Sequence, residues 1–391
     1  MGILSISFQV GLGQPVNNIG KMIVNSDTVW NKAGSPYNLT GNVVIDKGAI
    51  LTIEPGVTVY LNRYGIRVNG TLTVRGTNTD NIYLIGGSIY FAESSVSWNP
   101  QTETGCIIEN TVLKTSVSSP VTSIMINNNT ITNYIHAGIG VGNYIQAGGN
   151  SIISKNVILM PFYDYDTKPQ YGIGVSGATQ VSDNIIYGAF KNAAVTVGGS
   201  GAPTIQRNLI SNDYGLGIAI SSDTGKPLIK ENTITNCTDG ILIDQSTPII
   251  VNNNIEGITR YNVKMGIGSS IDVAASNNWW GTTDTAVIDQ KIYDYYDDAN
   301  FNLGKVNYMP ILSSPNSDAP SASSYPIATQ TLNPTATLPT TSQAPTETPL
   351  QPDSDEGLFF GLGLWQVVVV VLLGVIVVLL VFVVVFLRRR K

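Results

Sequence analysis

The chain has 391 residues, of which only 12% are Asp, Glu, Lys or Arg, about half the share in an ordinary soluble domain. Its net charge is −6 and no basic cluster precedes the last four residues, so we expect no nucleic-acid partner. The 39 glycines favour a fold with many tight corners.

Residues 1–27 form an N-terminal segment before the repeating part of the chain. Met1 to Gly13 would have to serve as an export signal, yet this stretch has no basic start, and Ser5, Ser7 and Gln9 interrupt its apolar run. We therefore expect a truncated or atypical signal here.

The first part of the body, from residue 28, alternates apolar and polar residues in short runs. The runs Asn42–Asp46, Ile50–Glu54, Val57–Leu61, Ile66–Asn69 and Leu72–Arg75 each suit a strand with one buried face. Turn-forming sequences separate them, including Glu-Pro-Gly and Asn-Gly. The pattern predicts a succession of short strands joined by tight corners.

Asparagine then recurs at nearly constant intervals, with successive spacings of 27, 28, 24, 24, 22 and 24 residues. The residues are Asn129, Asn156, Asn184, Asn208, Asn232, Asn254 and Asn278. A repeat of this length cannot bury its own apolar side chains, so repeats must stack. Because Asn tolerates left-handed backbone and bonds neighbouring backbone groups, we expect these side chains to form a ladder at the corners.

Each repeat carries two further apolar patches. One lies about nine residues after the Asn, as in Gly138–Val141 and Gly217–Ile220, and the other precedes the next Asn, as in Pro203–Ile205. Three short strands per repeat make one turn of a parallel β-solenoid. We predict that this all-β solenoid covers residues 28–312, with Asp284 capping a short helix through Ile292 near its end.

The chain resembles the right-handed parallel β-helix repeat proteins of the pectate-lyase-like superfold. The stretches Gly41–Ile45 and Leu51–Val57 look like the opening coils of exported members, and Asn278–Asp284 with Ile292–Asp294 looks like their ending. The resemblance implies a right-handed parallel β-helix. It implies little about activity, because this superfold includes lyases, hydrolases, adhesins and structural spacers.

Enzymes of this superfold use acidic clusters with an Arg or Lys base, or paired Asp residues with a Gly-His-Gly and an Arg-x-Lys. The chain matches neither set: its single histidine, His136, stands between Ile135 and Ala137, and Asn78-Thr79-Asp80 has no Asp pair one coil later. We assign no catalytic residue, no metal ligand and no cofactor. Calcium is an alternative, since Asp294, Asp297 and Asp298 supply hard oxygen ligands; the other reading of this cluster is a C-terminal cap.

The coils that begin at Asn129 and Asn156 are the longest, with extra residues near Tyr144–Gly149 and Pro161–Tyr171. Insertions in solenoids form loops on one face and often bind ligands. Exposed tyrosines beside charged residues suit sugar binding by stacking and hydrogen bonding. The ligand-binding candidates are Tyr163, Asp164, Tyr165, Asp166, Lys168 and Tyr171; the alternative is a loop that packs its own tyrosines.

Four sequons, at Asn38, Asn69, Asn128 and Asn236, are candidate N-glycosylation sites.

The C-terminal part of the chain has the composition of a stalk followed by a membrane anchor. Residues 313–356 contain eight prolines, many Ser and Thr, and no Lys or Arg, which is typical of an extended, disordered stalk. Within 357–387, the 21 residues Val367–Leu387 lack a polar side chain, enough for one transmembrane helix. The basic tail 388–391 predicts a cytoplasmic C-terminus and an outward-facing body.

From these features we predict a non-enzymatic, membrane-anchored cell-surface β-helix that acts in adhesion, envelope structure or glycan binding. Its partners would be the membrane, through the C-terminal helix, and surface polysaccharide or neighbouring surface proteins. Two alternatives remain: a polysaccharide lyase or glycoside hydrolase of the β-helix superfold, and a self-assembling surface-layer or filament subunit.

Overall fold

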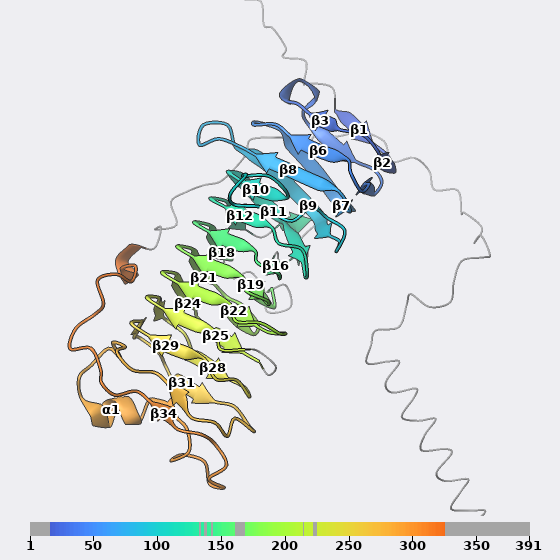
Figure 1. Ribbon diagram of the computed structural model, residues 1–391. Helices are drawn as coiled ribbons and strands as arrows, with labels where there is room; N and C mark the ends of the chain where they lie inside the picture. Colours follow the sequence, from blue (N-terminus) through green and yellow to red (C-terminus); the bar gives the residue numbers. More distant parts are fainter. Residues whose placement is uncertain are drawn as a thin grey trace, which may run out of the picture. The chain divides into compact units, whose positions relative to one another are not determined.

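The structure is a computed structural model that describes residues 16–132, 134–136, 139–141, 144–160, 169–213, 215–221 and 225–324. Within this part the chain winds into a parallel β-solenoid, as predicted, with successive coils stacked along one axis (Figure 1). Each typical coil contributes one strand to each of three sheets. We call them the back sheet, the ladder sheet and the groove sheet, in the order in which the chain meets them.

The back sheet has 12 strands, one per coil. They are β3 (Thr28–Trp30), β6 (Ile50–Ile53), β8 (Thr71–Arg75), β10 (Ile107–Glu109), β12 (Met125–Asn127), β17 (Ile152–Ser154), β20 (Gln180–Ser182), β23 (Thr204–Gln206), β26 (Leu228–Lys230), β29 (Ile249–Val251), β32 (Val273–Ala274) and β34 (Val306–Asn307).

The other two sheets are separate in the later coils. The ladder sheet contains β13 (Thr130–Thr132), β18 (Val157–Met160), β21 (Ile185–Gly188), β24 (Leu209–Asn212), β27 (Thr233–Thr235) and β30 (Asn254–Ile255). The groove sheet contains β16 (Ile145–Ala147), β19 (Tyr171–Val175), β22 (Ala193–Val197), β25 (Leu216–Ile220), β28 (Asp239–Ile243), β31 (Tyr261–Met265) and β33 (Ile292–Tyr293).

In the opening coils these two sheets merge, because long strands run through both. The strands are β1 (Asn17–Ile19), β2 (Met22–Val24), β4 (Tyr37–Leu39), β5 (Val43–Ile45), β7 (Thr58–Val68), β9 (Ile82–Phe91) and β11 (Thr111–Ser119). Strand β7 joins two runs that the sequence suggested as separate strands. Strands β1 and β2 pair with β4 and β5, so the solenoid already begins within the segment assigned as N-terminal.

Alternation of side chains builds the core. In the ladder sheet Ile158, Ile186, Ile210 and Ile234 stand in register from coil to coil, and each is fully buried. A stacked Ile contributes roughly 1.5–3 kcal/mol through burial. No single coil could provide this, since each Ile is covered by the Ile of the next coil.

The predicted asparagine ladder is present and buried. The Nδ2 and backbone N–H groups of one Asn donate to Oδ1 of the next, for example from Asn184 to Asn208 at 2.9 and 3.0 Å. The sequence placed one rung wrongly: Asn253, not Asn254, continues the ladder between Asn232 and Asn278. The position before each rung is left-handed, as at Lys155 with φ +56° and Asp183 with φ +58°.

One repeat element was misassigned in the long coil after Asn129. The Gly138–Val141 patch is not the groove-sheet strand. Instead β14 (Tyr134–His136) and β15 (Ile139–Val141) form an antiparallel pair outside the stack, with His136 opposite Ile139. The groove-sheet strand of this coil is β16, so the insertion precedes Tyr144 and does not follow it.

The C-terminal end closes with a short helix and a returning segment. Helix α1 (Thr285–Asp289) has the predicted cap, since the Ala286 N–H donates to Asp284 Oδ1 at 3.0 Å. Two 3₁₀ turns, η1 (Lys32–Gly34) and η3 (Ala322–Ser324), complete the elements. After β34 the described chain turns back along the coils (orange in Figure 1), which extends the packed body beyond Leu312.

No helix among the described residues is long and apolar enough to cross a membrane. The predicted anchor Val367–Leu387, the basic tail and the stalk from residue 325 onward lie outside these residues.

Candidate binding groove

A hollow of about 540 Å³ lies on the outer face of the groove sheet, across β22, β25 and β28. Its lining residues are Lys191, Asn192, Thr196, Val197, Gly215, Leu216, Ala219, Ile220, Ser221, Thr238, Asp239, Leu242, Asp244 and Arg260. They come from the three strands, from the turns on both sides of the sheet and, with Arg260, from the coil that follows β28. The hollow is therefore a groove that crosses the strands and runs along the solenoid axis.

The floor of the groove is a column of small and medium side chains. Thr196, Ala219 and Leu242 are paired in register on β22, β25 and β28. Their strand neighbours Val195 and Val197 point into the core and are buried, so the column faces outward. A chain of several linked units could lie along this floor, because the stacked strands repeat every 4.8 Å or so.

One wall carries an ion pair that joins two coils. Arg260 donates to both carboxylate oxygens of Asp239, from Nε at 2.8 Å and from Nη2 at 2.5 Å. The Tyr261 N–H adds a third donor at 3.2 Å. The side chain of Asp239 is 1% exposed, whereas that of Arg260 is 52% exposed. The hydrogen bond to Asp239 raises the pKa of Arg260, so the guanidinium presents a permanent positive charge to the groove.

The same wall continues toward the loop that the sequence singled out. The N–H groups of Lys191 and Asn192 each donate at 2.9 Å, to the carbonyls of Pro169 and Gln170 respectively. The Asn192 side chain donates to Gln170 Oε1 at 3.1 Å. Residues 169 and 170, which directly follow the predicted binding segment 161–168 in the sequence, are thus hydrogen-bonded to the groove wall.

Of the predicted binding residues, the structure describes Tyr171. It opens β19, and its ring meets that of Tyr144 edge-on, with the ring centroids 5.2 Å apart. Burial raises the pKa of Tyr171. Its register partners in the next coils are Ala193 and then Leu216, at the groove wall. Tyr163, Asp164, Tyr165, Asp166 and Lys168 lie outside the described residues.

The groove is suited to binding rather than to proton transfer. Asp239 directs its oxygens toward three N–H donors, and such a carboxylate is poorly placed to exchange a proton with a ligand. Asp244, the other carboxylate that lines the hollow, follows β28, at the end opposite Asp239. The groove thus combines a cationic guanidinium, amide and hydroxyl groups, and an apolar floor.

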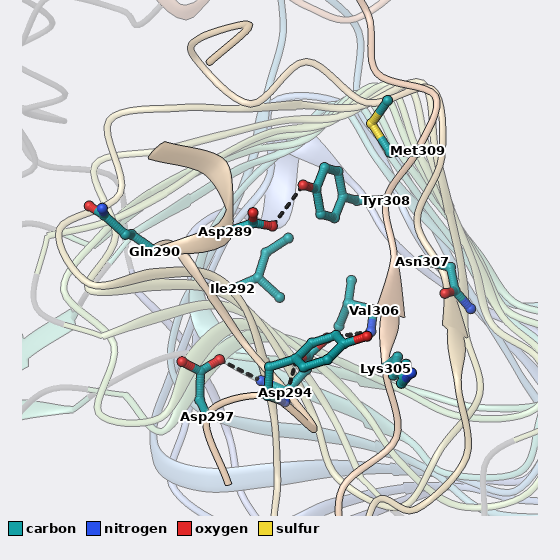
Figure 2. A pocket seen from close by; sticks show the side chains of 11 residues that line it. Asp289, Gln290, Ile292, Asp294, Asp297, Lys305, Val306, Asn307, Tyr308 and Met309 are labelled. Carbon is teal, nitrogen blue, oxygen red and sulfur yellow. Dashed lines mark hydrogen bonds between the residues drawn. The ribbon is translucent and has the colours of Figure 1, made fainter. Parts of the chain in front are cut away.

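A second hollow, of about 680 Å³, lies at the C-terminal end between β33 and β34 (Figure 2). Its lining residues are Asp289, Gln290, Ile292, Asp294, Tyr296, Asp297, Lys305, Val306, Asn307, Tyr308 and Met309. Tyr308 donates to Asp289 at 2.7 Å. Burial is the main cause, and this hydrogen bond the second, that raises the pKa of Tyr308 to about 12.

The acidic cluster considered for calcium lies in and beside this second hollow. Asp294 accepts the N–H groups of Tyr296 and Val306, and Asp298 accepts those of Asn300 and Asn302. Asp297 accepts the Asp294 N–H. The carboxylates thus stabilise the turns that end the solenoid. Within the described residues, no group of three or more His, Cys, Asp and Glu side chains is arranged to hold a metal ion.

The four sequons lie in different settings. Asn128 and Asn236 are exposed corner residues with φ +52°. Asn69 is half-buried, and Asn38 bridges Asn18 and Asn62 in a side-chain ladder on the surface. Their glycosylation stays a prediction.

Comparison with known proteins supports the fold. Residues 171–286 match the family model described as "Right handed beta helix region". This part of the chain is a right-handed β-helix. A 60-residue stretch is 40% identical to part of the Drosophila melanogaster protein named "Protein bark beetle". This match covers 15% of this chain and 2% of that protein. The chain therefore spans a very small part of this relative. No solved structure matches.

Sequence reasoning missed the groove wall. The available signal was the spacing: Asp239 and Arg260 are 21 residues apart, close to one coil, and Asp239 heads an otherwise apolar strand. Opposite charges one coil apart lie side by side in a solenoid, so this spacing could have identified the pair.

Proposed function

We propose that the protein is a non-enzymatic glycan-binding β-helix at the cell surface, and that the groove over β22, β25 and β28 holds an extended carbohydrate chain. The observation that carries the proposal is the outward column Thr196, Ala219 and Leu242 beneath a wall with an exposed, permanently charged Arg260. Sugars offer both apolar faces and hydroxyl groups, which match such a floor and wall.

The neighbouring loop extends this site. The contacts of Lys191 and Asn192 with Pro169 and Gln170 tie the groove to the segment that carries Tyr163, Asp164, Tyr165, Asp166 and Lys168. We propose that a glycan in the groove also contacts this segment. Aromatic stacking there would add about 0.5–1.5 kcal/mol for each ring.

The placement at the surface rests on the C-terminal sequence. The apolar span Val367–Leu387, followed by Arg388, Arg389, Arg390 and Lys391, has the length and the charge asymmetry of an anchor with a cytoplasmic end. Mass spectrometry of the native C-terminus tests this: retention of Lys391 supports an anchor, and a mature end before Val367, for example at Thr341, contradicts it.

The groove is tested with a matched pair of substitutions in one coil. Thr196→Trp fills the floor, whereas Thr204→Trp places the same side chain on the outer face of the back sheet, at a position that is likewise half-buried. The full chain, purified in detergent, is screened on a glycan array, and the glycans it retains are used for titration. We expect Thr196→Trp to weaken binding at least about ten-fold, or roughly 1.4 kcal/mol, and Thr204→Trp to leave it unchanged.

Two outcomes would contradict the proposal. Equal loss of binding in both variants would show that the effect does not arise in the groove. If the parent chain retained no glycan, the proposal that the ligand is a glycan would be wrong. The retained glycans are also analysed for cleavage. Release of shorter products would favour the polysaccharide lyase or hydrolase alternative.

A further inference from the structure

The floor of the groove belongs to a longer column of outward-facing residues on the groove sheet. After Leu242 the same register passes through Lys264 on β31 and ends at Tyr293 on β33. Before Thr196 it continues into the opening coils, where long strands run through both sheets. The residues of this part, in chain order, are Arg67, Tyr90, Ser118, Gln146 and Gly174. We call the set from Arg67 to Tyr293 the long column.

The long column has the same pair of residue types near each end. Arg67 Cζ lies 5.3 Å from the ring centroid of Tyr90, its partner in the next coil. Lys264 Nζ lies 5.7 Å from the ring centroid of Tyr293, again its partner in the next coil. The two pairs lie near opposite ends of the described solenoid, on β7 and β9 and on β31 and β33 (Figure 1). Eight steps of the register separate Arg67 from Lys264, or roughly 38 Å at about 4.8 Å per coil.

Neither cation of these pairs is neutralised within the part of the chain that the structure describes. No Asp or Glu carboxylate there forms an ion pair with Arg67 or Lys264. Arg67 Nε donates to Asn69 Oδ1 at 3.3 Å, whereas Arg260 uses both Nε and Nη2 to bind Asp239. A tyrosine ring attracts a cation through its face and uses none of the N–H donors of that cation. Both pairs therefore present unpaired positive charge and hydrogen-bond donors to a ligand.

Tyr171, the predicted binding residue that the structure describes, lies in the long column between the two pairs. Gly174 is aligned with Thr196, and because it has no side chain, the ring of Tyr171 occupies the space over it. A Cβ atom at position 174 would stand 2.7 Å from Cε2 of that ring. The long column thus carries an aromatic ring near each end and another between them. The Ser118 hydroxyl and the Gln146 amide, which are hydrogen-bonded to each other at 3.1 Å, lie between Tyr90 and Tyr171.

We propose that the long column is one binding track for a linear anionic glycan, whose carboxylate or sulfate groups are bound at the Arg67–Tyr90 and Lys264–Tyr293 pairs. This inference rests on the proposed function and specifies the charge and the length of the ligand. A guanidinium edge suits two-point binding of a carboxylate or sulfate, and a lysine supplies a point charge. Because the net charge of the protein is −6, attraction of a polyanion has to come from such local cations.

Charge-removing substitutions in the full chain, purified in detergent, test the track. The probes are long chains of alginate, which is carboxylated, of dextran sulfate, and of neutral dextran. Arg67→Gln and Lys264→Gln each remove one cation of the long column. Arg63→Gln is the matched control, because Arg63 is also exposed, lies on the same strand and stands over a tyrosine ring at 5.6 Å, but is outside the register of the long column. Thr196→Trp blocks the track between the two pairs.

We expect at least one of the two anionic probes to bind more tightly than dextran, and its identity distinguishes carboxylate from sulfate. Arg67→Gln and Lys264→Gln should each weaken that binding about three- to ten-fold and reduce its dependence on salt, while Arg63→Gln should leave it unchanged.

Three outcomes would overturn the inference. The first is a parent chain whose retained glycans on the array are bound equally well with and without charged groups, which leaves the proposed function standing. The second is an Arg67→Gln variant that binds like Arg63→Gln. The third is a loss in Arg67→Gln with none in Thr196→Trp, which would make the N-terminal pair a separate anion site and not part of one track. A parent chain that retains no glycan would instead contradict the proposed function itself.

Discussion

The opening coils and the later coils turn the same corner in two ways. Between the back sheet and the next strand, the corners after β3, β6 and β8 in the opening coils use four to six residues, as in Glu54–Val57 between β6 and β7. The coils with rungs from Asn129 to Asn253 use two, a left-handed residue followed by a ladder Asn, as in Asp183 and Asn184 between β20 and β21. The buried ladder therefore accompanies the shorter corner.

A two-residue corner leaves buried backbone groups without strand partners. The ladder Asn satisfies them: Asn208 Nδ2 donates to the carbonyls of Val181 and Gln206, and its Oδ1 accepts both donors of Asn184. The longer corners of the opening coils can satisfy their own backbone within the turn, as where the Val57 N–H donates to the Glu54 carbonyl. The comparison suggests that rungs are indispensable only where the corner is short.

The largest expected effect is the loss of one buried rung. Asn208→Leu removes the acceptor of the Asn184 N–H, one of the two acceptors of the Asn184 amide, and a donor to the Val181 and Gln206 carbonyls. We expect a loss of about 3–5 kcal/mol in unfolding free energy. Asn38→Ala removes a rung of the exposed ladder between Asn18 and Asn62 and should cost less than about 1 kcal/mol. Urea denaturation of both variants measures the difference; equal costs would refute the distinction between the two ladders.

The opening coils should instead depend on their glycine corners. Gly56 has φ +78°, and a Cβ there would approach the Lys32 side chain and Asp80. We expect Gly56→Ala to cost about 1–2 kcal/mol. Gly20→Ala is the matched control, because nothing lies within 4 Å of its Cβ position. Thermal unfolding compares the two variants, and a Gly56→Ala melting temperature equal to that of Gly20→Ala would contradict the role of this corner.

The repeated Asn and the three apolar patches were sufficient to predict the parallel solenoid, because stacking is the only way to bury such short strands. They were not sufficient to place every rung. In Asn252-Asn253-Asn254 three candidates are adjacent, and only the packing decides that Asn253 points inward while Asn254 binds the backbone of Asn316. Likewise Gly138–Val141 has the apolar pattern of a groove-sheet strand, although Ile139–Val141 pairs antiparallel with Tyr134–His136 outside the stack.

The candidate site was less predictable than the fold. The sequence indicated the segment before Tyr171 as a binding site, and in the structure Pro169 and Gln170 contact the groove wall. The wall itself depends on Asp239 and Arg260, which meet only when coils stack. The packing of residues 312–324 could not be predicted from their composition, because Pro, Ser and Asn suggest a free linker. In the structure, Asn254 and Thr233 of the ladder sheet bind the backbone of Asn316 and Pro320.

A smaller effect is expected at the left-handed position that precedes each rung. Lys155 is exposed and has φ +56°, a conformation that glycine adopts at little cost. Lys155→Gly should therefore be more stable than Lys155→Ala by about 1 kcal/mol, since both lack the side chain but only glycine relieves the strain. The denaturation midpoints of the two variants provide the test. If alanine were the more stable of the two, the left-handed corner would not be a source of strain.

The smallest effect concerns charge at these same corner positions, where Lys155, Asp183, Arg207 and Glu231 alternate in sign along four coils. Arg207 is 2.7 Å from Asp183 and 3.7 Å from Glu231. Partial burial would raise the pKa of Asp183, but hydrogen bonds from Arg207 and Ser182 and the charges of Arg207 and Lys155 outweigh it, so the pKa lies below its ordinary value of 3.8.

A carboxyl whose pKa is lower in the folded state stabilises the protein above pH 3.8, and this contribution disappears as the pH falls through the folded-state pKa. Asp183→Asn should therefore lower stability at pH 7 but not near pH 2. Because these side chains are about one-third exposed, the difference at pH 7 should stay below about 1 kcal/mol. Arg207→Gln removes the main partner of Asp183. We therefore expect the stability of this variant, too, to fall less between pH 7 and pH 2 than that of the parent. Urea denaturation from pH 7 to pH 2 measures it, and a parallel offset at every pH would indicate lost packing instead of lost charge.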